Sequence, residues 1–144
     1  MTDKSGNKLE GEKTTNKTSD KISNKTSDKI SIGIVGTRSF NDYPFFKAKV
    51  TELIPKDKEI TIISGGAKGA DTFAEKYAKE NSLNIKVFRP NWTLYGKAAG
   101  PIRNKDIILS SDIIIAFWDG KSPGTKSSIN LAVKHKKELH IVTY

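Results

Sequence analysis

The chain of 144 residues contains no cysteine. Disulfide bonds, thiolate-ligated zinc and a cysteine nucleophile are therefore excluded, and this composition fits a reducing compartment. The two histidines, His135 and His140, have no sequence neighbours that would complete a metal site or a Ser-His-Asp set. We expect neither a bound metal nor a cofactor.

Long apolar runs are also missing. No stretch approaches the ~18 consecutive apolar residues of a membrane-spanning helix, and residues 1–8 lack the apolar segment of a secretory signal. The sequence therefore predicts a cytoplasmic protein with no membrane partner.

The mean hydropathy of −0.50 conceals an uneven distribution of polar residues. Residues 1–29 contain only Met1, Leu9 and Ile22 as sizeable apolar side chains, and residues 16–23 are repeated letter for letter at 24–31. Such a segment cannot bury enough apolar surface to offset the entropy of ordering. We predict a flexible polar tail over 1–29 and one domain over 30–144.

The formal net charge is +9, of which residues 30–144 carry +7. A basic domain favours anionic partners, such as nucleotides, nucleic acid or an acidic protein surface. The charge alone does not choose among these partners.

Apolar runs alternate with helical patterns throughout the predicted domain. The strands are expected at 29–35, 59–63, 84–88, 112–118 and 138–143, with a helix between each pair and a long loop at 89–100. This alternation predicts a doubly wound α/β, Rossmann-like three-layer fold with a five-stranded parallel sheet of order 3-2-1-4-5. In that order the turns after strands one, two and four meet at one edge of the sheet.

Glycine-rich turns follow these three strands. The turn Ser64-Gly65-Gly66-Ala67-Lys68-Gly69-Ala70-Asp71 leads from strand two into a helix, and its glycines allow backbone amides to surround an anion. The alternative is a tight connection in which glycines only permit close packing. The Gly-x-Gly-x-x-Gly and Walker patterns are both absent.

Several side chains near these turns are candidate ligand contacts. We predict a binding site formed by Gly36, Thr37, Arg38, Ser64, Gly65, Gly66, Gly69, Asp71, Arg103, Asn104, Gly124 and Thr125. Arg38 and Arg103 would supply charge to a phosphate. Trp92 and Tyr95 in the long loop would either stack on a base or pack the loop down.

Asp71 and Thr125 have two interpretations each. Asp71 either caps the second helix or accepts hydrogen bonds from ribose hydroxyls, and Thr125 either contacts the ligand or caps the fourth helix. If a bond is hydrolysed, Asp71 and Asp119 are the candidate catalytic residues, because the turns contain no other carboxylate.

Four motifs together resemble a known superfamily. They are Gly36-Thr37-Arg38-Ser39-Phe40, the turn 64–71, Gly100-Pro101-Ile102-Arg103-Asn104 and the segment 119–125. In this order they resemble the SLOG superfamily, with the YspA (cpYpsA-related) branch the nearest match, over roughly residues 30–144. The resemblance implies a Rossmann-like fold that binds nucleotides or nucleotide-derived ligands, often as a homodimer.

Two relatives within that superfamily imply different functions. LOG-type phosphoribohydrolases carry a catalytic Glu where this chain has Ser128, which puts N-glycosidic cleavage by their mechanism in doubt. The DNA-processing protein DprA family has motifs similar to Gly36-Thr37-Arg38, 64–71 and Arg103-Asn104-Lys105, but also has domains that this chain lacks.

We therefore predict binding, with processing left open, of a nucleotide or nucleotide-derived ligand such as an ADP-ribose or NAD derivative. An enzyme of this kind would be an N-glycosidic or phosphoester hydrolase. The alternative is a DprA-like protein that binds single-stranded DNA, and a third possibility is a structural role with an empty crevice.

Overall fold

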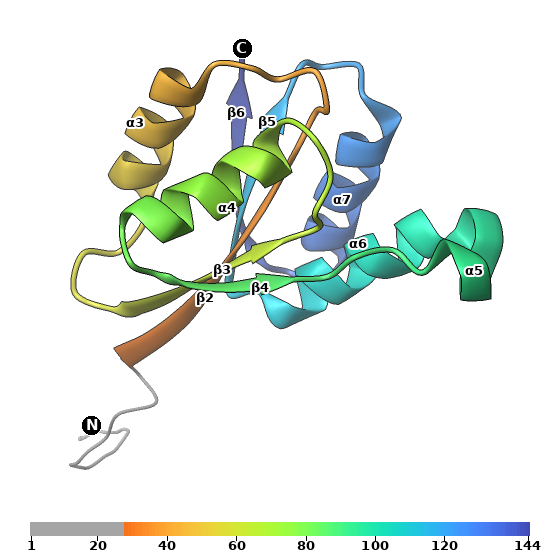
Figure 1. Cartoon of the computed structure of the whole chain (residues 1–144), viewed down its shortest axis with the longest axis horizontal. Helices are drawn as coiled ribbons and strands as arrows, with labels where there is room; N and C mark the ends of the chain where they lie inside the picture. The colour runs from red at the N-terminus through yellow and green to blue at the C-terminus, as the bar shows by residue number, and fades with distance from the viewer. Residues whose placement is uncertain (1–27) are drawn as a thin grey trace. The chain divides into compact units, whose positions relative to one another are not determined.

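A computed structural model describes residues 28–144. Of the predicted tail over 1–29, residues 1–27 lie outside the described residues, whereas Lys29 is the first residue of β2. Residues 30–56 and 60–144 form one compact unit. With the labels of Figure 1, the elements are β2 Lys29–Gly36, α3 Tyr43–Leu53, β3 Glu59–Ser64, α4 Ala70–Glu80, β4 Asn84–Val87, α5 Trp92–Tyr95, the 3-10 turn η3 Gly96–Ala98, α6 Ala99–Ser110, β5 Ile113–Trp118, α7 Pro123–Lys134 and β6 Glu138–Thr143.

The strands form one parallel sheet of order β4-β3-β2-β5-β6. In chain order this is 3-2-1-4-5, so the predicted fold class and strand order are confirmed. Ile32 of β2 is in register with Ile113 of β5, and Ile113 is in register with Glu138 of β6. From β2 the successive strands β3 and β4 are added on one side, and β5 and β6 are added on the other side. In sheets of this kind a crevice lies at the carboxyl ends of the two strands where the order changes, here β2 and β5.

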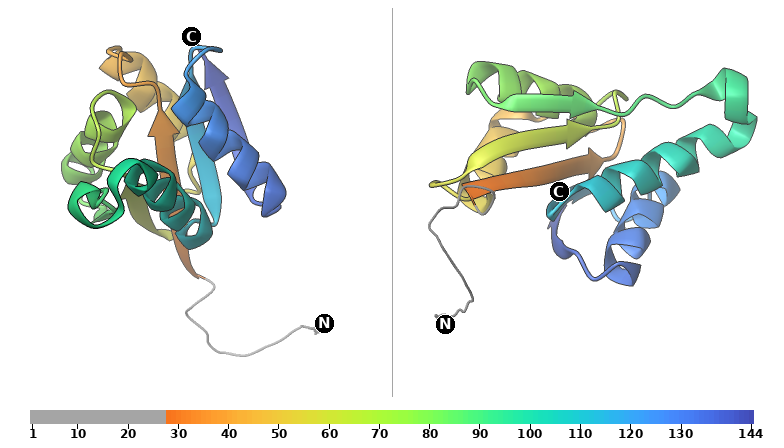
Figure 2. Two further views of the ribbon diagram at one scale, coloured as in Figure 1. Left: turned by 90° about the vertical axis from the view of Figure 1, so that its right-hand side faces the viewer. Right: turned by 90° about the horizontal axis from the view of Figure 1, so that it is seen from below.

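Helices cover both faces of the sheet (Figure 2). Ile113, Ile115 and Phe117 of β5 belong to one buried cluster together with α3 and α4, whereas Ile114 and Ala116 belong to a second cluster with α6 and α7. Because successive side chains of a strand point to opposite faces, a strand covered on both sides needs an unbroken apolar run. The run 113–118 meets this need.

Side chains cap the starts of α3 and α7. The Asp42 carboxylate accepts a 3.1 Å hydrogen bond from the Phe45 amide, and Pro44 occupies the first turn of α3. At α7 the cap is Ser122, whose hydroxyl accepts from the Thr125 amide. The capping alternative for Thr125 is therefore wrong, because Thr125 lies inside the first turn.

The segment 89–100 was expected to be a loop, and it is largely helical. The Asn91 side chain accepts a 3.0 Å hydrogen bond from the Leu94 amide and caps α5. Helix α6 begins at Ala99, inside the segment that was expected to be a loop. Among the described residues, no helix has the length and apolar character needed to span a bilayer.

Candidate functional site

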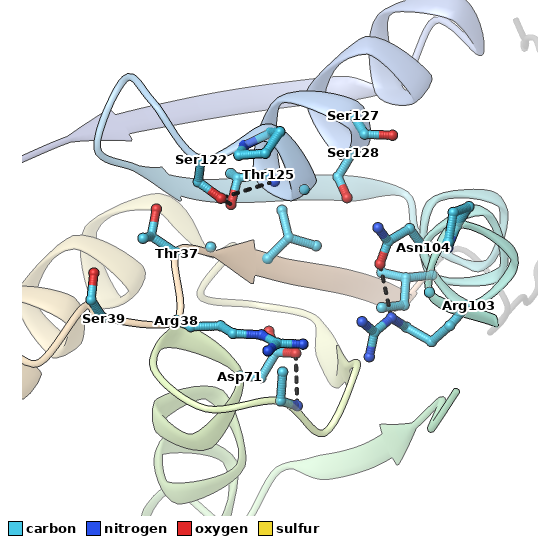
Figure 3. A pocket seen from close by; sticks show the side chains of 18 of the residues that line it. Thr37, Arg38, Ser39, Asp71, Arg103, Asn104, Ser122, Thr125, Ser127 and Ser128 are labelled. Atoms are coloured by element: carbon cyan, nitrogen blue, oxygen red, sulfur yellow. Dashed lines mark hydrogen bonds between the residues drawn. The ribbon is translucent and has the colours of Figure 1, made fainter. Parts of the chain in front are cut away.

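A cavity of about 680 Å³ lies at the carboxyl edge of the sheet (Figure 3). The turn after β2, the first turn of α7, the start of α6 and Asp71 of α4 contribute to its wall. The structure therefore brings residues of all four separated motifs to one cavity. The predicted site residues that line it are Gly36, Thr37, Arg38, Asp71, Arg103, Asn104, Gly124 and Thr125.

Two arginines reach into this cavity from different walls. Figure 3 shows Arg38 and Arg103 extending toward each other from the β2 turn and from α6. Burial lowers the pKa of the Arg103 guanidinium below its usual value, the negative charge of Asp71 raises it, and the positive charge of Arg38 lowers it further. Two neighbouring cations that repel each other gain stability when an anion binds between them.

Arg103 is held in place by the protein. Its Nε donates a 2.8 Å hydrogen bond to the Asn104 side chain, and its Nη1 donates to the Gly65 carbonyl. A Cβ at Gly65 would lie 2.6 Å from Nη1 of Arg103, so glycine is needed there for the approach of the guanidinium. Arg38, by contrast, is exposed to solvent.

Backbone amides of the glycine-rich turn after β3 donate to side chains of the chain itself. The Ala67 amide donates a 3.1 Å hydrogen bond to Oδ2 of Asp71, and the Gly66 amide donates to the Ser64 hydroxyl at 3.2 Å. Asp71 is 6% exposed. Burial raises its pKa above the ordinary value, while the backbone hydrogen bonds and the charge of Arg103 oppose the rise.

The interpretation of Asp71 as the cap of the second helix is wrong, whereas its contact with ribose hydroxyls stays a prediction. The N-cap residue of α4 is Gly69, which makes no side-chain cap bond, and Asp71 lies in the first turn and reaches back to the preceding loop. It also lines the cavity. A single carboxylate therefore orders the glycine turn and faces the ligand site.

The remaining predicted residues of that turn lie outside the larger cavity. Ser64 is fully buried and donates to the Asp71 carbonyl at 3.3 Å. Gly65 and Gly66 line a smaller neighbouring cavity. Gly69 has φ +73°, and a Cβ there would lie 2.4 Å from the Thr37 carbonyl oxygen, so this glycine allows the turns after β2 and β3 to touch.

Asp119 does not line the cavity either. Its Oδ1 accepts 2.8 Å hydrogen bonds from the amides of Lys121 and Ser122, and these bonds lower its pKa. The Asp119 amide donates to the Thr37 hydroxyl at 3.4 Å. Asp119 therefore orders the loop before α7, which presents Gly124 and Thr125 to the cavity.

The wall formed by α7 is rich in hydroxyl groups. Ser122, Thr125, Ser127 and Ser128 line the cavity, and Ser128 is 2% exposed with its hydroxyl directed into the cavity in Figure 3. The first-turn amides of a helix lack carbonyl partners, and the helix dipole adds positive potential there. Hydroxyl groups, amides and arginines together provide the donors that a phosphate accepts from.

Sequence reasoning did not assign Ser39, Ser122, Ser127 and Ser128 to the site, although all four line it. Ser127 and Ser128 follow Gly124-Thr125 at the spacing of the next helical turn, which could have indicated them. Ser39 and Ser122 adjoin predicted residues. Within residues 28–144, no group of three His, Asp or Glu side chains could hold a metal ion.

A family model and a phage protein are similar to this chain in sequence. The model of the YspA, cpYpsA-related SLOG family matches residues 31–95. The Gene 61 protein of Mycobacterium phage D29 is 31% identical over 108 residues, which cover 70% of this chain and 86% of that protein.

Two solved structures of DNA processing protein A (DprA) share the fold. The structure from Streptococcus pneumoniae has a TM-score of 0.64 at 19% identity, and the match covers 78% of this chain and 50% of the DprA chain. The structure from Helicobacter pylori, described for its single-stranded DNA binding mode, has a TM-score of 0.57 at 25% identity, with coverage of 80% and 66%. This chain thus spans half to about two thirds of those proteins. From the phage relative and the family model together, the chain belongs to the YspA, cpYpsA-related SLOG family.

Proposed function

We propose that this protein binds a nucleotide or nucleotide-derived ligand, with a phosphate of the ligand in the larger cavity. One observation carries the proposal: Arg38 and Arg103 enter the cavity from two walls and face the hydroxyl-rich first turns of α7. The volume of about 680 Å³ falls in the range of small-ligand sites. The family and the DprA fold support nucleotide or single-stranded DNA binding as the general class.

The phosphate position follows from which donors are free. The amides of Gly66 and Ala67 already donate to Ser64 and Asp71. The Thr125 amide likewise donates to the Ser122 hydroxyl. The Gly124 amide, the hydroxyl groups of α7 and the two arginines therefore offer the phosphate site, while Gly65, Gly66 and Gly69 shape the neighbouring backbone.

The finer proposal is that the ligand is an ADP-ribose or NAD derivative. Asp71 would then accept hydrogen bonds from ribose hydroxyls, and Asn104 would meet a phosphate or a base edge. Of the described residues that line the cavity, Asp71 alone carries a carboxylate. Hydrolysis of the bound ligand would therefore depend on Asp71, and Asp119 would contribute through the loop that it orders.

A thermal-shift measurement tests binding. The panel contains AMP, a cyclic mononucleotide, ADP-ribose, NAD and a single-stranded oligonucleotide. A ligand at a hundred times its Kd adds about 2.7 kcal/mol, which raises Tm by roughly ten degrees in a domain of this size.

Two matched variants locate the response. Arg38→Gln should abolish most of the shift, because it removes one of the two cations. Lys105→Gln removes an equal charge from the exposed face of α6 and should leave the shift intact. A panel in which nothing raises Tm, or equal losses in both variants, would contradict the proposal.

Single-stranded DNA is the second candidate. The observation that favours it is the fold shared with the Helicobacter pylori protein described for single-stranded DNA binding. In this case a phosphate of the strand would occupy the same position between Arg38 and Arg103.

A homodimer, which the family resemblance implies, is also a proposal. Light scattering coupled to size exclusion tests it. A mass near twice 15.9 kDa is expected, and a mass near 15.9 kDa at all concentrations would contradict it.

A further inference from the structure

A second cavity of about 300 Å³ adjoins the larger one. Arg38, Ala67, Trp92 and Arg103 line both cavities and so form the boundary between them. Because the two cavities share these side chains, one ligand can extend from the first into the second.

Arg89 is positioned in the second cavity by the glycine turn. Its Nη1 donates a 3.3 Å hydrogen bond to the Gly66 carbonyl, and its Nη2 lies 4.0 Å from Oε1 of Glu75. Gly66 has φ +72°, and a Cβ there would lie 2.4 Å from Nη1 of Arg89. The backbone therefore leaves room for this guanidinium, while 66% of the Arg89 side chain is exposed and keeps donors for a ligand.

Trp92 supplies an aromatic surface at the boundary. It is 54% exposed, although it lines both cavities. Asn91 caps the short helix that begins at Trp92, and a Cβ at Gly100 would lie 3.6 Å from the indole, so the side chain rests against α6. An indole that is held at one edge and open on the rest of its surface suits stacking on a base.

We propose that the smaller cavity is a second nucleotide subsite, in which Arg89 holds a phosphate and Trp92 stacks on a base. The ligand class is therefore a dinucleotide rather than a mononucleotide. This inference rests on the proposed function of the larger cavity.

Calorimetric titration of the full chain tests the subsite. The probes are thymidine 5′-monophosphate, 5′-phosphorylated dithymidylate and NAD. The wild type should bind a dinucleotide more tightly than the mononucleotide. If dithymidylate binds more tightly than the mononucleotide and NAD does not, the two nucleotides of the ligand are joined as in a DNA strand. The reverse result identifies a pyrophosphate-linked ligand.

Variants separate the two subsites. Arg89→Gln should lower dinucleotide affinity about 10- to 100-fold and leave mononucleotide affinity within about twofold, since a charge-assisted hydrogen bond to the second phosphate is lost. Lys86→Gln removes a cation from β4 that lines neither cavity and should change neither affinity.

Trp92→Ala should lower dinucleotide affinity about 5- to 150-fold. The matched variant Tyr95→Ala removes an exposed aromatic of the same helix that lines neither cavity, and should have no effect.

Two results would overturn the subsite. One is an Arg89→Gln variant that binds the dinucleotide as tightly as the wild type does. The other is an Arg89→Gln variant that loses equal affinity for the mononucleotide and the dinucleotide. In either case Arg38→Gln would still lower the affinity for the mononucleotide, and the proposed function would stand. If the wild type binds none of the three probes, both proposals fail.

Discussion

The Asp71 carboxylate accepts a 3.1 Å hydrogen bond from the Ala67 amide, four residues before it. Through this bond the first turn of α4 orders the glycine turn that precedes it. Amides of the glycine turn that an external anion could have used therefore donate to side chains of the same protein. An external phosphate is consequently expected at the α7 wall of the cavity.

Burial of this carboxylate makes stability depend on pH. The folded-state pKa of Asp71 is raised, so its ionised form costs stability at neutral pH, and the cost disappears as the pH falls through that pKa, above the ordinary 3.8. Asp71→Asn keeps an acceptor for the Ala67 amide and removes the charge. The Tm of the variant relative to wild type should therefore rise between pH 4 and pH 7. The corresponding gain in free energy of unfolding is about 1.4 kcal/mol for each unit by which folding raises the pKa of Asp71.

Thermal denaturation of both proteins across that pH range measures the difference. Asp119→Asn is the control, because the lowered pKa of Asp119 puts its titration below this range, so its Tm difference from wild type should change little between pH 4 and pH 7. A Tm difference between Asp71→Asn and wild type that is constant or falls with pH would show that Asp71 is not penalised by burial.

Close contact between two turns requires glycine at position 69. A Cβ at Gly69 would lie 2.4 Å from the Thr37 carbonyl oxygen and 2.6 Å from that of Arg38, with φ at +73°. Gly69→Ala should lose about 2–4 kcal/mol, since it adds both overpacking and backbone strain. In Gly124→Ala the new methyl meets nothing within 4 Å, and stability should change by less than about 0.5 kcal/mol.

Urea denaturation followed by circular dichroism compares these two variants. Equal stability of Gly69→Ala and Gly124→Ala would mean that the turns after β2 and β3 do not depend on each other.

The salt dependence of binding distinguishes the two candidate ligands. Each phosphate of a single strand that is neutralised contributes about 0.7 to the slope of log affinity against log salt. A mononucleotide between Arg38 and Arg103 should give a slope of about 1 or less, whereas a strand that contacts several cations should give a steeper one. Fluorescence titration at four salt concentrations supplies both slopes, and a steep slope with negligible mononucleotide binding would favour the DNA candidate.

The sheet was predictable because its signals are local. The apolar run at 113–118 and the cap at Asp42 each specify their own element, and glycines after three strands indicate the ligand edge. Strand order followed from the right-handedness of the crossovers.

The details of the site were less predictable because they depend on tertiary contacts. The Ala67 amide donates to Asp71 because the Asp71 side chain points back toward the preceding turn. A sequence does not reveal whether such a carboxylate points toward its own loop or away from it. Asp119 stands in a similar turn, yet it bonds the amides of Lys121 and Ser122 instead. The helical segment at 92–98 was missed because Gly96 and the aromatic residues are typical of loops.

The most direct measurement of the central claim is an amide and arginine Nε chemical-shift titration of the ¹⁵N-labelled protein with AMP. We predict that the largest changes occur at Arg38, Arg103, Gly124 and Thr125, and that the Arg38→Gln variant shows much smaller ones. Shifts concentrated instead along α3 and β6, or no shifts at millimolar AMP, would contradict the account.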